Sequence, residues 1–260
     1  MFGIFKKKPV LSKDDILFQI ETFKWLMKHF GGDDFYRDTV LVLPTKEFFP
    51  SEVSHEKEAA IKTFLQVKKF AGLESWDCVL VEQDEDPDPR VGSTLLMQGI
   101  ESSAAGTFSF TEETVQISYN PSLLKQPTNL VATFAHELAH YLTATSPEEP
   151  PGGWKNWEFA TDLTAVFLGF GIFMANSAFT FQQFTDFDSQ GWSTNRSGYL
   201  TETEFCYALA IFCALKNISV NQASIHLKPH LKRLMKRCAN ELEQSLVNSI
   251  IDQEYAGNGL

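Results

Sequence analysis

Two histidines four residues apart, with a glutamate directly after the first, are the residues here whose types and spacing suit catalysis. They lie in the stretch TFAHELAHYL, residues 133–142. Four residues turn an α-helix by about 400°, so on a helix His136 and His140 point to the same side, about one turn apart. Their ring nitrogens can then converge on one metal ion, and zinc binds imidazole at ~2.0–2.1 Å.

A catalytic zinc ion takes three protein ligands and leaves a fourth position to water, so a third ligand is needed. The next helical stretch offers Glu158 and Asp162 in the pattern E-x-x-x-D, which places both carboxylates on one helix face. We predict that Glu158 is the third ligand and that Asp162 accepts the free N–H of His136 and fixes its tautomer. Glu137 projects about 100° around the helix from His136, a position suited to a general base that acts on water at the metal.

The two motifs together, H-E-x-x-H and E-x-x-x-D, resemble those of the glutamate-zincin metallopeptidases. The resemblance covers only residues 136–162. It implies zinc binding by His136, His140 and Glu158, water activation by Glu137, and a supporting carboxylate at Asp162. It also implies that the strand TVQISYN, residues 114–120, is an edge strand along which an extended peptide binds.

Glutamate zincins commonly add a histidine or tyrosine that hydrogen-bonds the developing oxyanion, and no motif identifies that residue here. Tyr199 is our candidate, because it precedes a helix that begins with a capping box from Thr201 to Glu204. A purely structural tyrosine at the helix entrance is the alternative. Tyr119 and Tyr141 are weaker candidates.

The elements that must position these residues fall into two groups. Short runs rich in leucine and β-branched residues predict strands, and they cover residues 39–44, 77–83, 105–111 and 114–120. The first two flank a helix at 51–70 as a strand, helix, strand unit, and the last two form a hairpin. Helical periodicity covers residues 12–30, 128–144, 157–178, 201–216 and 222–249.

We therefore expect an α+β fold, zincin-like by resemblance. A small mixed sheet occupies the N-terminal half, and a predominantly helical C-terminal half carries the H-E-x-x-H helix. We expect an α/β lobe over residues 1–127 and a helical lobe over residues 128–260, with the site where they meet. The segment PEEPPGG, residues 147–153, breaks the helical pattern between the two motifs and lets the second helix run back antiparallel.

Charge and hydropathy limit the partners. The 260 residues include 22 basic and 33 acidic ones, a formal charge of −11, which repels nucleic acid and anionic lipid over most of the surface. We expect neither nucleic acid nor a membrane as partner.

The apolar run 163–175 is shorter than the ~20 residues that cross a bilayer, which favours a buried core helix. The start MFGIFKKKPV reverses the order of a secretory signal, which favours a cytoplasmic protein.

Several other motifs are weaker. His226 and His230 repeat the four-residue spacing, but Pro229 and the neighbouring basic residues oppose a bound cation. The loop that begins at Asp186 resembles a calcium loop but has Ser197 at the twelfth position, where a glutamate is needed. His29 and His55 have solvated or capping roles in our interpretation. The cysteines lack a C-x-x-C pair and are expected as buried thiols: Cys78, Cys206, Cys213 and Cys238.

The sequence thus predicts a zinc-dependent hydrolase, a peptidase above all, that acts on a peptide or protein substrate. The rival is a catalytically silent binding or interaction protein on the same scaffold, with a structural metal or none. Hydrolysis of a non-peptide amide is a third possibility. The sequence predicts neither the oligomeric state nor the cleavage specificity.

Overall fold

The computed structural model of the chain describes residues 8–50, 56–83, 106–110, 115–186 and 199–257. The helices are α1 (Lys13–Phe30), α2 (Asp33–Asp38), α3 (Glu56–Phe70), α4 (Pro127–Ala144), α5 (Trp157–Ala165), α6 (Gly171–Asp186), α7 (Glu202–Leu215), α8 (Val220–Ser224), α9 (Pro229–Glu241) and α10 (Gln244–Gly257). Shorter turns are the 3-10 helices η1 (Pro121–Lys125) and η2 (Trp154–Asn156) and the π-helical turn η3 (Val166–Phe170). The strands are β1 (Cys78–Glu82), β2 (Gly106–Phe110) and β3 (Val115–Tyr119).

The three strands form one mixed sheet in the order β1-β3-β2. β2 and β3 are antiparallel, with Phe108 opposite Ile117, which confirms the predicted hairpin. β1 pairs with the other side of β3 in parallel. The expectation that residues 114–120 form an edge strand is therefore wrong, because β3 is hydrogen-bonded on both sides and offers no free edge to a peptide.

Residues 39–44, predicted as a strand, belong to no strand in the structure. Leu41 and Val42 are buried in the core, and the N–H of Val42 donates to the carbonyl oxygen of Gly169 at 3.0 Å. An apolar β-branched run signals burial as well as strand structure, and here the run packs against a helix. The predicted strand, helix, strand unit is wrong for the same reason.

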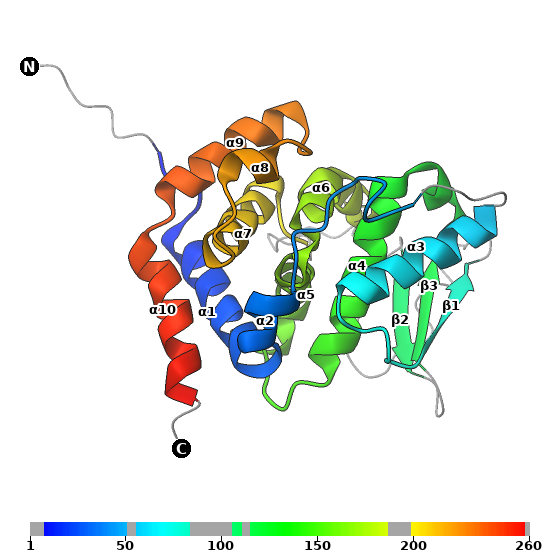
Figure 1. Ribbon diagram of the computed structural model, residues 1–260, viewed down its shortest axis with the longest axis horizontal. Coiled ribbons are helices and arrows are strands. Elements are labelled where there is room, and N and C mark those ends of the chain that lie inside the picture. The colour runs from blue at the N-terminus through cyan, green and yellow to red at the C-terminus, as the bar shows by residue number, and fades with distance from the viewer. Residues whose placement is uncertain (1–7, 51–55, 84–105, 111–114, 187–198, 258–260) are drawn as a thin grey trace, which may run out of the picture.

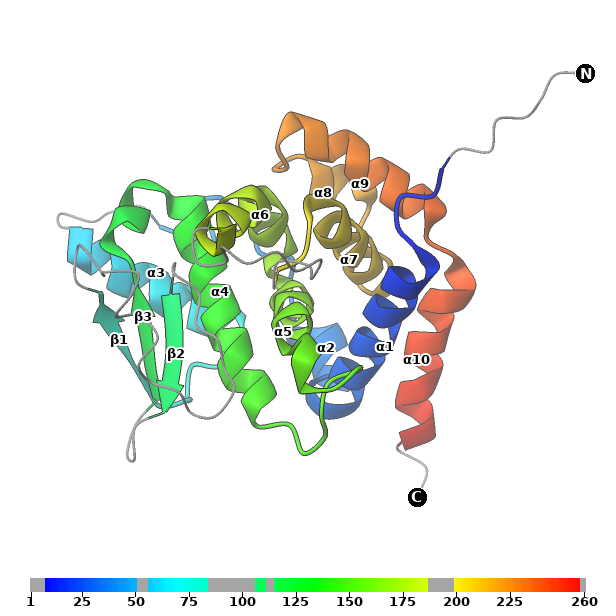
Figure 2. The same cartoon turned by 180° about the vertical axis from the view of Figure 1, so that it is seen from behind.

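α4 runs through the middle of the molecule, between the sheet and α3 on one side and α5 and α6 on the other (Figures 1 and 2). The ring of Phe134 in α4 contacts Phe64 of α3 and Tyr119 of β3, with centroids 5.2 and 5.7 Å apart. α5 returns antiparallel to α4 in Figure 1, as the break at residues 147–153 predicted. α7 packs on α6, and α9, α1 and α10 lie outside them.

The apolar stretch from Trp154 to Ala178 is the helical run in the described residues that is long and apolar enough to cross a membrane, and 89% of its most apolar window is buried inside the protein. Phe167, Phe170 and Phe173 lie in the core, and the ring of Phe167 stacks on Phe35 at 4.5 Å. The prediction of a buried core helix at residues 163–175 is confirmed.

Gly169 interrupts that core helix with a φ of +98°. A Cβ atom there would overlap the carbonyl oxygen of Val40, and one at Gly171 would meet Leu209 at 2.9 Å. Both glycines thus allow close packing, Gly169 against the 39–44 segment and Gly171 against α7. The freed carbonyl of Gly169 is the one that Val42 binds.

The predicted helix at 222–249 is three helices, α8, α9 and α10. Pro229 begins α9 at the first helical turn, where its missing N–H costs nothing. Helices and one small sheet agree with an α+β fold. The core cluster includes residues from both halves of the chain, and the division into lobes at residue 127 stays a prediction.

We predict that Gly169→Ala lowers the free energy of unfolding by about 3 kcal/mol or more, because the new methyl group combines backbone strain with overlap. Gly72→Ala is the matched control, since Gly72 has a φ of +73° but open space around it, and should cost about 1 kcal/mol. Urea unfolding measures both. Equal losses would mean that the close contact with Val40 contributes nothing.

Candidate metal centre

The H-E-x-x-H motif lies in the most buried part of α4. The helix begins at Pro127, a residue suited to the first turn, and every residue from Leu130 to His140 is buried. Burying imidazole and carboxylate groups is costly unless they are paired. The partners of His136, Glu137 and His140 therefore decide what the site can do.

Three side chains converge at the contact between α4 and α5. The Nε2 atoms of His136 and His140 lie 3.0 Å apart, and Glu158 Oε2 lies 3.4 and 3.3 Å from them. These residues form a group that can hold a metal ion. Ligands bound at ~2.0–2.1 Å in a tetrahedron stand about 3.3 Å from one another, so the observed spacing matches three corners of a zinc site.

Asp162 binds the nitrogen of His136 that faces away from the cluster. Its Oδ1 atom lies 3.0 Å from His136 Nδ1, and its Oδ2 atom accepts the backbone N–H of Leu200 at 2.9 Å. When Nδ1 carries the proton for Asp162, Nε2 presents its lone pair to the cluster. The structure thus brings together all five residues of the two motifs, and it ties them to the segment that leads into α7.

Two residues that the sequence motifs did not indicate support the second histidine. Thr161 Oγ1 lies 3.3 Å from His140 Nδ1, and the ring of Trp157 stands edge-on to His140 with centroids 5.0 Å apart. Trp157 is itself fixed, since its Nε1 donates to Thr143 Oγ1 at 2.8 Å. A usable signal existed, because Trp157 and Thr161 are four residues apart and therefore share one face of the helix that carries Glu158.

The charges of the cluster depend on one another. Burial alone lowers the pKa of His136, but the neighbouring carboxylates of Asp162 and Glu158 outweigh it and raise the pKa well above its ordinary value. Burial alone raises the pKa of Glu158, but His140 and His136 reverse this and hold it well below its ordinary value. Burial raises the pKa of Asp162, and His136 offsets this only in part. The centre therefore attracts positive charge, whether a proton or a metal ion.

The donor set fits a divalent ion of the zinc type. Glu158 Oε2 is buried and accepts no hydrogen bond among the described residues, although it faces two imidazole nitrogens. A buried carboxylate oxygen without a donor is costly, and a cation between the three atoms removes that cost. Two imidazoles and one carboxylate are also the donor types that zinc prefers at catalytic sites.

Glu137 and Tyr199 both lie beside His136. Glu137 is 2% exposed, and its charge helps to raise the pKa of His136. The ring of Tyr199 is 5.5 Å from that of His136. The hydroxyls of Tyr119 and Tyr141 bind Glu82 and the carbonyl of Asp77, whereas the ring of Tyr199 packs against the cluster at His136.

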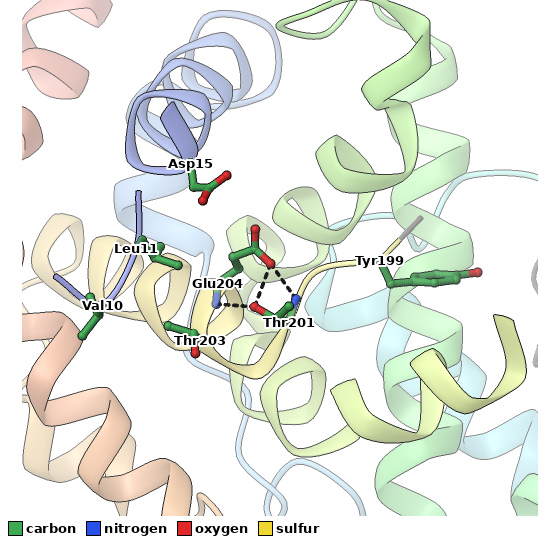
Figure 3. A pocket seen from close by; sticks show the side chains of 7 residues that line it. All are labelled: Val10, Leu11, Asp15, Tyr199, Thr201, Thr203 and Glu204. Atoms are coloured by element: carbon green, nitrogen blue, oxygen red, sulfur yellow. Dashed lines mark hydrogen bonds between the residues drawn. The ribbon is translucent and has the colours of Figure 1, made fainter. Parts of the chain in front are cut away.

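A pocket of about 290 Å³ lies on the other side of Tyr199 and does not include the metal cluster. Its lining consists of Val10, Leu11, Asp15, Tyr199, Thr201, Thr203 and Glu204. Figure 3 shows the ring of Tyr199 pointing away from the other six side chains, while Thr201 and Glu204 form the predicted capping box. The tyrosine is thus held at the helix entrance and turned towards the cluster.

The weaker sequence motifs do not form sites in the described residues. His230 binds Glu202 at 2.9 Å and is far from buried, and His226 precedes α9, so the pair does not share one helix face. His29 pairs with Glu148. The four cysteines are free thiols, and Cys206, Cys213 and Cys238 are buried as expected, whereas Cys78, on the strand β1, is only partly buried. The loop after Asp186 and His55 lie outside the described residues.

Comparisons of the chain with models of protein families, with curated proteins and with solved structures find no match.

We predict that the purified protein binds about one zinc ion per chain and that Glu158→Ala abolishes this binding, because two imidazoles alone hold zinc weakly. Elemental mass spectrometry after dialysis measures the metal content. Glu202→Ala is the matched control, since it removes an exposed histidine–glutamate pair, and it should leave zinc unchanged. A Glu158→Ala protein that retains its zinc would disprove the triad.

Proposed function

We propose that the protein is a zinc-dependent hydrolase with a zincin-like active site, and that its substrate is a peptide or protein. The observation that carries this proposal is the convergence of His136 Nε2, His140 Nε2 and Glu158 Oε2 within 3.0–3.4 Å. Glu137, buried directly beside them, adds a carboxylate that the ligand set does not use. A purely structural zinc site has no need of that fourth group.

The roles of the side chains follow from their positions. Bound zinc supplies Lewis acidity, which polarises a carbonyl and lowers the pKa of water towards ~7. The Glu137 carboxylate takes the proton from the attacking water and passes it to the leaving amine. Asp162 keeps the proton of His136 on Nδ1, and Thr161 orients His140 through the same ring position.

Access to the cluster is one-sided. The side chains of His136 and His140 are 1% and 6% exposed, whereas that of Glu158 is 22% exposed. Substrate and water therefore approach from the Glu158 side, and α4 closes the site behind. The buried histidines keep their geometry while the substrate side remains open, as a preorganised site requires.

Tyr199 is the best placed residue for the oxyanion. It is 7% exposed, its ring packs on His136, and the next residue, Leu200, binds Asp162 through its backbone N–H. The same short segment before α7 thus carries the tyrosine and, through Asp162, supports the metal ligand His136. Its phenolic proton is a suitable donor to a developing negative charge.

The rival proposal is a silent binding protein that keeps the metal without turnover. It predicts a zinc content equal to that of an enzyme and no cleavage of any peptide. The substitution of Glu137 separates the two proposals, because it concerns proton transfer and not metal binding.

We predict that Glu137→Gln retains zinc and loses turnover by about 10²- to 10⁴-fold, the range expected for a general base. Cleavage of a quenched fluorescent peptide library gives the rate, and elemental analysis gives the zinc content. Removal of zinc with a chelator and its return should abolish and restore the activity of the wild-type protein. Undiminished cleavage by Glu137→Gln would remove Glu137 from the mechanism.

We predict that Tyr199→Phe lowers kcat by about 10²-fold with little change in KM, because the lost hydroxyl acts on the transition state. Phenylalanine keeps the ring contact with His136, so folding and zinc content should stay as in the wild-type protein. A kcat equal to that of the wild-type protein would assign Tyr199 a structural role only.

A further inference from the structure

One segment of the chain carries basic residues and no acidic ones. Residues 220–240 contain five of the 22 lysines and arginines and none of the 33 acidic residues. The remainder then has 17 basic against 33 acidic residues, a formal charge of −16. A strongly acidic protein therefore carries one segment of charge +5, which the overall value of −11 conceals.

The structure gathers these charges on one side of α9. Leu231, Met235 and Cys238 are fully buried and pack the helix against α7. The basic residues lie on the opposite side, at spacings of one, three and four residues. We call them the basic face: Lys228, Lys232, Arg233, Lys236 and Arg237.

The basic face is exposed and its charges are uncompensated within the described protein. Four of the five side chains are exposed and Lys232 is half-buried, and none of the five forms an ion pair with any residue that the structure describes. The neighbouring acids are engaged elsewhere: Glu202 binds His230, and Glu241 accepts the N–H of Val10 at 2.7 Å.

Such a helix face is unfavourable in the isolated protein. Lys232 and Lys236, and likewise Arg233 and Arg237, are like charges four residues apart, and each such pair destabilises a helix by a few tenths of a kcal/mol. Asn176 nevertheless holds the start of α9 in place, since it binds the carbonyl of His226 and the N–H of Lys228 at 2.9 Å each. The start of the helix that carries the basic residues is thus held in place by hydrogen bonds.

The position and surroundings of the basic face favour a flat, anionic partner. α9 lies at the outer edge of the molecule, at the end opposite the sheet (Figures 1 and 2). Ile225, 63% exposed, stands beside its start. Val10 is bound at the end of α9, which brings the exposed Lys8, third of the lysines at residues 6–8, to the same end.

We propose that the basic face docks the protein on an anionic phospholipid surface. Basic side chains near such a surface are attracted by its negative potential, and Ile225 supplies an apolar group to the headgroup region. The segment 220–240 holds no acidic residue, and the two acids next to it, Glu202 and Glu241, are bound to His230 and Val10. The contact is peripheral, because the apolar side of α9 is already buried against α7. It does not depend on the proposed hydrolase activity.

The test uses the full chain and vesicles of phosphatidylcholine with or without phosphatidylserine, with bound protein measured by sedimentation. The basic-face variant carries Arg233→Gln, Lys236→Gln and Arg237→Gln. The matched control carries Lys57→Gln, Lys62→Gln and Lys69→Gln, three exposed lysines of α3, and loses the same net charge. Thermal unfolding checks that both variants fold.

We expect the wild-type protein and the α3 control to bind phosphatidylserine vesicles and not neutral ones. The basic-face variant should bind about a hundredfold more weakly, since each basic residue near the surface contributes about a fivefold factor. Wild-type binding should also fall as salt is added, which tests the proposal without any variant.

Three results would overturn the proposal. The first is that the wild-type protein binds neutral and anionic vesicles equally well, or binds neither. The second is an equal loss in the two variants, which would make the effect one of net charge. The third is wild-type binding to polyglutamate in solution without binding to phosphatidylserine vesicles, which would assign the basic face to an acidic protein segment.

Discussion

The contact between His136 and Asp162 is the interaction on which the centre of the molecule depends. It joins α4 to α5 inside the core, where both side chains are almost fully buried, and an unpaired partner on either side would be costly. Asp162 extends the link to Leu200 and so to the entrance of α7. One carboxylate thereby fixes three separate segments relative to one another. The apolar surroundings of α4 raise the cost of breaking this polar contact.

The local signals in the sequence were sufficient for much of the fold and for the residues of the cluster. Helical spacing placed His136, His140, Glu158 and Asp162, because the positions of side chains on one helix depend only on the backbone geometry. The hairpin was predictable for a similar reason, since alternation and a short turn are local features. The break between residues 147 and 153 was visible in the sequence, and it sets the antiparallel course of α5.

Features set by contacts between distant segments were not predictable. Residues 39–44 have the composition of a strand, yet their partner is the carbonyl that Gly169 frees in a helix more than a hundred residues later. The parallel pairing of β1 with β3 likewise decides which strand is central, and no local pattern reports it. Helical spacing placed Thr161 on the same face as Trp157, but its contact with His140 arises only from the packing of α5 on α4. The net charge likewise did not indicate where the basic residues lie. Their common position follows from the burial of the opposite side of α9.

The aromatic packing around His140 also makes tryptophan fluorescence sensitive to the occupancy of the centre. Trp157 touches the imidazole edge-on, and Trp154, half exposed on the preceding turn, stands 5.5 Å from Trp157. Indole emission responds to nearby charge and is quenched by paramagnetic ions, so loading the centre with such an ion changes the light emitted by these two rings. Trp157 contacts the ligand His140, and Trp154 is half exposed to solvent. The emission of the two rings therefore responds to metal binding and to a molecule that approaches the exposed side of the site.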